Sequence, residues 1–229
     1  MSHVGDHHHL GTALLKKGDL EGAIAEFRND LRLNPNDVCA HSSLGFALQK
    51  QGDLKGAIAE YRAALRLNPN DVCAQYNLGT ALWKKGDVKG AITEYRATLR
   101  LDPNEVDAHY SLGNALEKNG DYEGAIAEYR AVLQLNPNHG RAHNYLGIEL
   151  KKKGDLEGAI AEYRAALRLD PNEADFRYNL AVSLEAIGDL VSARKEYKKA
   201  LKLMPKTSDY EDHVTYIKLA LSRLNGAMR

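Results

Sequence analysis

The 229-residue chain has little of several features that common functional classes require. It contains two cysteines, one tryptophan and three phenylalanines. No apolar run is long enough for a signal peptide or a membrane span. Lysine plus arginine and aspartate plus glutamate both total 31, so the formal net charge is zero and no overall field attracts nucleic acid or acidic membranes. These absences predict a cytoplasmic protein that binds neither nucleic acid nor membrane.

The sequence also lacks the motifs of catalysis. We find no Ser-His-Asp set in a recognisable context, no CxxC, no phosphate-binding loop and no paired acids outside the repeated pattern described below. The run from His7 to His9 continues in register into Leu10 and Gly11, so it is repeat sequence and not a metal site. The chain is therefore predicted to be no enzyme and to hold no cofactor and no metal.

What the chain does have is a period of 34 residues. Three sets of residues recur at that spacing: Gly11, Gly45, Gly79, Gly113 and Gly147; Gly18, Gly52, Gly86, Gly120, Gly154 and Gly188; and Pro35, Pro69, Pro103, Pro137, Pro171 and Pro205. A fixed period of this length marks a solenoid, in which one small unit stacks on copies of itself. A stacked array offers a long surface for binding and no obvious deep catalytic pocket.

Each unit reads as two helices joined by a tight turn. In the second copy we expect a helix over about residues 38–50, which ends at Gly52, and a second over about residues 54–67. Glycine can take the left-handed conformation that closes a helix, and Asp53 suits the start of the next one. Pro69 disfavours helix in the residue before it, so the pair ends there. Two helices bury little alone, and the units must therefore stack.

Residues 72–105 resemble a tetratricopeptide repeat (TPR). With Val72 as position 1, the matching residues are Leu78, Gly79, Gly86, Ala91, Tyr95, Leu99 and Pro103. Five further copies cover residues 4–37, 38–71, 106–139, 140–173 and 174–207, so six repeats make up residues 1–207. The resemblance implies an all-α, right-handed α-solenoid of stacked antiparallel helix pairs.

The two ends of the array differ. Apolar residues at three- and four-residue steps predict one more amphipathic helix within residues 208–229, which caps the last repeat: Tyr210, Val214, Ile217, Leu221 and Leu224. The first repeat begins almost at Met1 without such a cap, which suggests a trimmed chain or an end that pairs with another molecule.

The family resemblance implies that the first helix of each pair lines a concave face, chiefly through positions 2, 5, 6, 9, 12 and 13. The residues predicted there are Phe46, Tyr76, Asn77, Thr80, Trp83, Lys84, Tyr110, Asn114, Lys118, Asn144, Tyr145, Tyr178 and Asn179. Aromatic anchors flanked by cations and amides suit an extended peptide or a partner helix. In the plainer interpretation, the position-5 tyrosines pack on their neighbours and the position-13 lysines are solvated surface. Trp83 fits that interpretation least.

Chaperone-binding relatives grip a terminal carboxylate with a clamp that needs lysine at position 5. Here position 5 holds His8, Ser42, Tyr76, Tyr110, Asn144 and Tyr178. At position 2 the only cation is Arg141. The sequence therefore predicts a protein-interaction scaffold without the carboxylate clamp.

Three other functions stay open at this point. The chain could self-assemble as a homo-oligomer through its first repeat, could be a substrate-recruiting module from a larger enzyme, or could be a designed array with consensus-like repeats. Arginines on the second helices raise nucleic acid binding, but each repeat carries its own neutralising acids, which favours a solvated outer face.

Four residues bear on local chemistry. Asp30 and Glu149 replace alanine at packing positions, and an unpaired buried charge is expensive. We expect Asp30 to reach water at the edge of the array and Glu149 to need a partner.

Cys39 and Cys73 lie one repeat apart, too far for a disulfide, and are expected to be free thiols.

Overall fold

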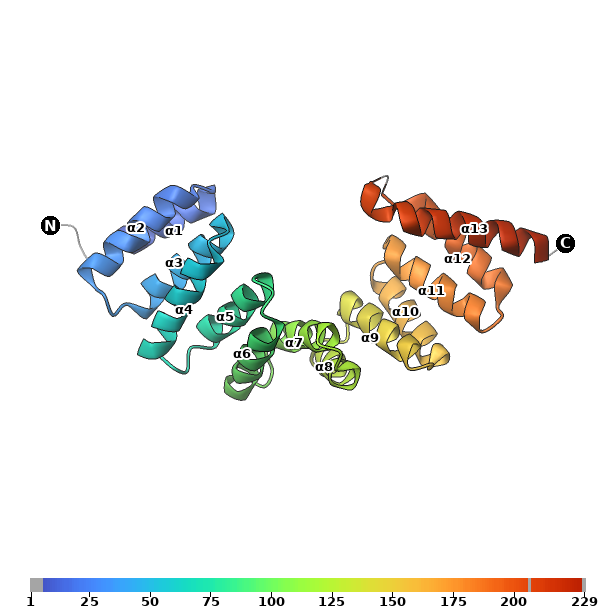
Figure 1. Cartoon of the computed structure of the whole chain (residues 1–229), viewed down its shortest axis with the longest axis horizontal. Coiled ribbons are helices and arrows are strands. Elements are labelled where there is room, and N and C mark those ends of the chain that lie inside the picture. Colours follow the sequence, from blue (N-terminus) through green and yellow to red (C-terminus); the bar gives the residue numbers. More distant parts are fainter. Residues whose placement is uncertain (1–5, 206, 228–229) are drawn as a thin grey trace. The chain divides into compact units, whose positions relative to one another are not determined.

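The computed structural model describes residues 6–205 and 207–227, and its regular elements there are helical (Figure 1). The α-helices are α1 (Asp6–Lys17), α2 (Leu20–Leu33), α3 (Val38–Gln51), α4 (Leu54–Leu67), α5 (Val72–Lys84), α6 (Val88–Leu101), α7 (Val106–Lys118), α8 (Tyr122–Leu135), α9 (Gly140–Lys152), α10 (Leu156–Leu169), α11 (Ala174–Ala186), α12 (Leu190–Leu203) and α13 (Glu211–Ala227). A short 3₁₀ helix, η1 (Ser208–Tyr210), precedes α13. The all-α class is confirmed.

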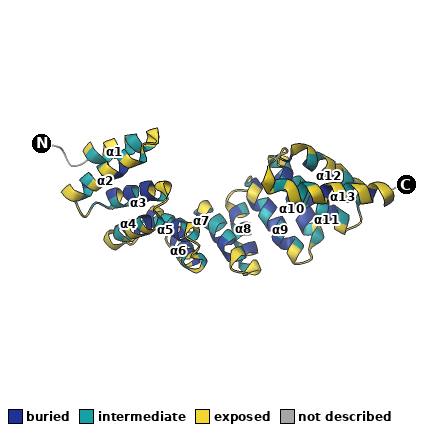
Figure 2. Ribbon diagram, turned by 45° about the horizontal axis from the view of Figure 1, so that its top comes forward, coloured by how far each residue is buried: buried dark blue, intermediate teal, exposed yellow. Residues whose placement is uncertain are grey.

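The helices fall into two compact units, residues 1–121 with α1 to α7 and residues 122–229 with α8 to α13. Inside each unit every helix contacts the next one along the chain, and the first helices of successive pairs also touch. Buried faces in Figure 2 turn toward neighbouring helices, whereas exposed residues gather at the turns and outer faces. Each unit is thus a stack of helix pairs with a continuous core.

The turn between paired helices has the predicted chemistry. Gly52 ends α3 at a φ of 99°, in the left-handed region that glycine adopts without steric cost. Asp53 then caps α4, because its Oδ1 accepts a hydrogen bond of 2.9 Å from the backbone N–H of Gly56. The predicted helix bounds of 38–50 and 54–67 are confirmed to within one residue.

In the pair of α3 and α4, the core is a large ring that lies on a glycine. Tyr61 in α4 is fully buried, and its ring lies so close to Gly45 of α3 that a Cβ there would come within 2.8 Å. The Tyr61 hydroxyl donates a hydrogen bond of 3.3 Å to Gln49 Oε1. Burial raises the pKa of that hydroxyl above its ordinary value. The absent side chain at Gly45 is what allows the two helices to approach.

A recurring polar contact, which we call the clasp, ties α3, α9 and α11 each to two other segments. His41 Nδ1 lies 2.6 Å from Glu60 Oε2, and its Nε2 lies 3.0 Å from the carbonyl oxygen of Pro35 in the preceding turn. His143 repeats both contacts with Glu162 and Pro137. Both partners are hydrogen-bond acceptors, so each ring nitrogen faces an acceptor oxygen.

The last copy shows what the clasp requires. Arg177 occupies the repeat position of His41 and His143, and its guanidinium donates to Glu196 Oε2 at 2.6 Å and from Nε to the Pro171 carbonyl oxygen at 3.1 Å. Arginine carries donors in a fixed fork and is permanently charged, so it fills the same role. An arginine therefore makes the same two contacts as a histidine at this position.

We expect His41→Arg to keep the free energy of unfolding within about 0.5 kcal/mol, whereas His41→Leu should lower it by about 1–2 kcal/mol, because it leaves the Glu60 carboxylate and the Pro35 carbonyl without their donor. Urea unfolding followed by circular dichroism measures both variants. Equal losses for arginine and leucine would mean that the shape of the imidazole, and not its donors, holds the segments together.

The two carboxylates at packing positions, Glu149 and Asp30, have different surroundings. Glu149 is fully buried and has a partner, as predicted, because Lys152 Nζ donates to its Oε1 at 2.8 Å. The expectation that Asp30 reaches water at an edge is wrong. Asp30 in α2 is 1% exposed, and neither of its carboxylate oxygens has a hydrogen-bond partner among the residues that the structure describes. Its helix packs on both α1 and α3.

In the C-terminal segment, α13 packs against α12. Ile217 and Leu224 are buried there, and Arg223 donates to Glu185 Oε1 of α11 at 2.6 Å. The sequence predicted one continuous helix, but residues 208–210 form η1, which places Tyr210 apart from the apolar face of α13. That α13 caps the array stays a prediction, as do the repeat boundaries.

The cysteines and the length of the apolar helices bear on the cellular compartment of the chain. Cys39 and Cys73 are free and exposed, as predicted from their separation. Across residues 6–205 and 207–227, no helix is both long and apolar enough to cross a membrane.

Candidate functional site

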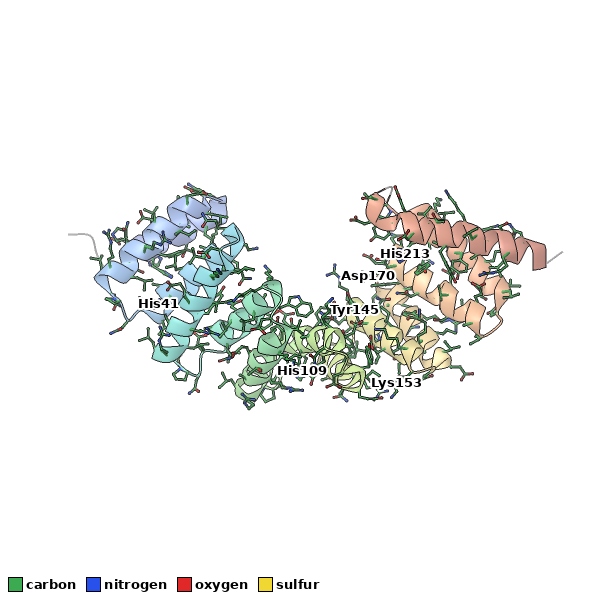
Figure 3. The ribbon with its side chains drawn as sticks, in the orientation of Figure 1. His41, His109, Tyr145, Lys153, Asp170 and His213 are labelled. Atoms are coloured by element: carbon green, nitrogen blue, oxygen red, sulfur yellow. The ribbon has the colours of Figure 1, made fainter. Side chains whose placement is uncertain are left out.

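The predicted groove residues all lie on the first helices of their pairs. α3, α5 and α7 carry them in residues 1–121, and α9 and α11 carry them in residues 122–229. Each unit is considered separately below. Figure 3 labels Tyr145 on α9 and His213 on α13, which belong to the same unit.

In the first unit, Tyr76 links the surface to the core. Its ring lies 5.7 Å from the ring of buried Tyr95, and its hydroxyl lies 3.2 Å from Ser111 Oγ on the next first helix. The Tyr95 hydroxyl in turn donates to Thr80 Oγ1 at 3.4 Å. Burial raises the pKa of Tyr95. Tyr76 therefore has a packing role, as the plainer interpretation holds, and still presents part of its ring.

The lysines at repeat position 13 have different surroundings. Lys50 Nζ lies 5.3 Å above the ring of Phe46, one turn earlier on α3, which is cation–π geometry. Lys84 and Lys118 are exposed at the ends of α5 and α7. Trp83 is half-buried beside Lys84.

A small cavity, which we call the α5 cavity, lies at the start of that helix. It has a volume of about 210 Å³ and is lined by Val72, Cys73, Tyr76, Asn77, Glu105 and Asp107. Two predicted residues, Tyr76 and Asn77, meet here. The two acids come from the start of α7 and were not among the predicted residues.

A larger cavity of about 460 Å³, which we call the C-terminal cavity, lies in the second unit. It is lined by Asn144, Tyr145, Ile148, Asp175, Tyr178, Asn179, Asp209, Tyr210 and His213. The structure thus brings together all four residues predicted on α9 and α11. The remaining wall comes from η1 and α13, which sequence reasoning assigned to the cap alone.

Hydrogen bonds between successive first helices fix the floor of the C-terminal cavity. Asn179 Nδ2 donates to Asn144 Oδ1 at 3.0 Å, and the Tyr210 hydroxyl donates to Asp175 Oδ2 at 3.3 Å. Both bonds join residues 35 apart, as do His8 with Ser43 and Tyr76 with Ser111 in the first unit. Two of the predicted groove asparagines, Asn144 and Asn179, are therefore hydrogen-bonded to each other and hold two helices in register.

Aromatic packing fixes the walls. The ring of Tyr145 stacks on buried Tyr129 with centroids 5.7 Å apart, and Tyr178 meets the edge of His213 at 4.7 Å. Burial and the neighbouring Tyr216 raise the pKa of Tyr178. These rings are held in place before anything binds, which lowers the entropy cost of recognition.

Seven predicted residues line neither cavity: Phe46, Thr80, Trp83, Lys84, Tyr110, Asn114 and Lys118. The residues that sequence reasoning missed are the acids at repeat position 2. Asp107 and Asp175 occupy that position, and Asp209 follows Asp175 by one period of 34. This register was the signal that could have found them.

Family models give the chain its place among known proteins. A model described as TPR repeat matches residues 11–52, 48–86 and 147–188, which is more than half of the chain. The chain belongs to the tetratricopeptide repeat family. Two further tetratricopeptide repeat models match residues 76–140 and 174–207. TPR proteins generally bind protein or peptide partners and are typically non-catalytic, so this TPR chain is a protein-interaction scaffold.

Solved structures agree with that assignment. The chain is similar to YrrB, described as a TPR protein with an unusual peptide-binding site, at 26% identity and a TM-score of 0.69, over 79% of this chain and 93% of that one. A MamA structure from Desulfovibrio magneticus RS-1 is 26% identical with a TM-score of 0.68, over 75% and 99% of the two chains. PilF of Pseudomonas aeruginosa shares the fold at 20% identity, with a TM-score of 0.78 over 93% and 97%. Among curated proteins, no relative matches the TPR chain significantly.

Proposed function

We propose that this TPR chain binds an extended peptide segment of a partner protein along the first helices of its pairs. The observation that carries the proposal is the C-terminal cavity, where four residues predicted from sequence line one space with fixed aromatic walls. YrrB, with its peptide-binding site, supports the same mode for this chain. A partner helix in the groove is the other form of the proposal, and the test below separates the two by the sequences that bind.

Aromatic side chains are the expected anchors of the peptide. Trp83, Tyr76 and Tyr110 serve the first unit, and Tyr145 and Tyr178 serve the second. Aromatic rings supply large contact areas at low entropy cost and dominate many interfaces. The carboxylate clamp of chaperone-binding relatives plays no part, because position 5 carries no lysine.

A random peptide display library selected against the full TPR chain tests the proposal. Selected peptides should bind about ten-fold or more weakly to a Trp83→Ala variant and to a Tyr145→Ala variant than to the unchanged chain. Trp83 is the only tryptophan, so its fluorescence also reports binding near α5 directly.

Tyr122→Ala is the matched control, because Tyr122 is 46% exposed on α8 and lines neither cavity. Each variant must keep the helical circular dichroism of the parent. A library that yields no binding peptide, or peptides that bind all variants equally, would overturn the proposal.

Self-assembly through the first repeat is the competing function. Leu10 on α1 is 49% exposed, whereas its equivalents Leu44 and Leu78 are each 3% exposed. An apolar face of this kind can bind a second copy. A molar mass above that of the monomer, which falls to the monomer in a Leu10→Lys variant, would favour self-assembly over peptide binding.

A further inference from the structure

The C-terminal cavity has a chemical character that narrows its ligand, and the inference that follows rests on the proposed function. Two carboxylates, Asp175 and Asp209, and three tyrosines, Tyr145, Tyr178 and Tyr210, line it, and its described lining contains no lysine or arginine. In a TPR groove predicted to pair aromatic residues with lysines, this wall is aromatic and acidic instead.

The two carboxylates have no cationic partner within the described residues. Among the described residues, the Asp175 side chain accepts a hydrogen bond only from the Tyr210 hydroxyl. The Asp209 side chain accepts one only from the neighbouring Ser208 hydroxyl, at 3.4 Å. Ion pairs elsewhere in this unit, such as Arg177 with Glu196 and Arg223 with Glu185, leave them out. Their charge therefore acts on whatever enters the cavity.

The local field is visible in the ionisation of Tyr210. The charge of Asp175 raises the pKa of the Tyr210 hydroxyl, followed by smaller contributions from burial and from Glu173 and Asp209. A site that disfavours the tyrosinate anion favours a cation, because the same negative potential acts on both.

The rings complete a site for a cation on a flexible stem. A guanidinium or ammonium group within about 6 Å of an aromatic face is attracted by the ring quadrupole. Tyr178 is held by His213 at 4.7 Å and by Tyr216 at 5.8 Å, so its ring cannot easily move away. Half-buried Tyr145 is held by Tyr129.

We propose that the C-terminal cavity binds an arginine or lysine side chain of the partner peptide, with Asp175 and Asp209 neutralising its charge and Tyr145 and Tyr178 contacting its stem and head. Asn144 supports the orientation. It is 6% exposed, its Oδ1 accepts a hydrogen bond from Asn179, and its Nδ2 has no hydrogen-bond partner among the described residues, which leaves that donor for a peptide carbonyl.

The first unit carries the same combination independently. The α5 cavity joins Tyr76 and Asn77 to the acids Glu105 and Asp107, again with no basic residue in its lining. Asp107 and Asp175 share repeat position 2, so one register places an acid beside a tyrosine in both units. The partner is accordingly a basic peptide.

The test is a titration of the full chain with N-acetyl-arginine methylamide, followed by amide shifts in a ¹H–¹⁵N NMR spectrum. We expect saturable shifts in α9, α11 and the η1 segment, and binding weakened about five-fold or more in Asp175→Asn/Asp209→Asn, with less binding at higher salt. N-acetyl-citrulline methylamide has the same shape without charge and should shift these residues little.

Glu157→Gln is the control variant, because Glu157 is an exposed acid of the same unit outside the cavity. It should leave arginine binding unchanged. Equal binding of citrulline and arginine, or equal binding by the parent and the Asp175→Asn/Asp209→Asn variant, would overturn the inference.

The display selection separates this inference from the proposed function. Peptides rich in arginine or lysine that lose affinity in Asp175→Asn/Asp209→Asn support both. A different result would be peptides that lose affinity in Trp83→Ala or Tyr145→Ala and keep it in Asp175→Asn/Asp209→Asn. That result supports peptide binding in the groove and refutes the cation-binding site. Arginine binding without any selected peptide would support the site and refute extended-peptide recognition.

Discussion

Replacing Tyr61 with alanine is expected to lower the free energy of unfolding by about 3–5 kcal/mol. Tyr61 is fully buried, and its ring fills the space left by the missing side chain of Gly45. Removing the ring loses its transfer free energy and leaves a cavity that the stacked helices cannot close without moving. Urea unfolding gives the change, and amide hydrogen exchange shows whether α3 and α4 open first.

Tyr61→Phe is the matched control for that prediction. It removes only a hydroxyl whose hydrogen bond to Gln49 is long, at 3.3 Å, so a loss within about 1 kcal/mol is expected. A small loss for alanine would show that the ring is not the main support of the pair. A large loss for phenylalanine would assign that support to the hydroxyl.

Replacing Asp30 with alanine is expected to raise the free energy of unfolding by about 1–3 kcal/mol, the opposite sign from most core substitutions. Asp30 is 1% exposed and neither oxygen is hydrogen-bonded, whereas Ala64, Ala166 and Ala200 occupy the same repeat position with no exposure. Alanine therefore fits the space and removes a polar group that burial deprives of water.

Two further variants make the Asp30 prediction specific. Asp30→Asn removes the charge but keeps two polar atoms without partners, so its gain should be smaller than that of alanine. Glu21→Ala changes an exposed acid on the same helix and should shift stability by less than about 0.5 kcal/mol. A loss of stability in Asp30→Ala would mean that the carboxylate supports the structure in the folded chain.

The fold could be predicted from sequence because every local signal repeats. Gly52 and Pro69 act through backbone conformation and Asp53 through a side-chain cap, all within a few residues, and their equivalents recur at a fixed period. The burial of Asp30 could not be predicted in this way, because it depends on how α2 packs on α3. An edge position in sequence is not an exposed position in space.

The candidate site could be predicted only in part, for a related reason. Family resemblance directs attention to positions on first helices, which found Tyr145 and Tyr178, but it assigned residues after 207 to a cap. η1 and α13 instead supply Asp209, Tyr210 and His213 to the cavity wall. Their contribution depends on where the last segment turns, and that turn at residues 208–210 departs from the repeated pattern.

The clasp also has a consequence for how such a chain can change length. Each clasp is contained in a short span, from Pro35 to Glu60 in the second copy, and it draws every atom it needs from one junction between neighbouring copies. A gene duplication or deletion of any whole 34-residue segment would recreate an intact junction at the new joint. The chain can therefore be lengthened or shortened by whole copies without breaking this contact, whereas an insertion between Pro35 and Glu60 would separate its parts.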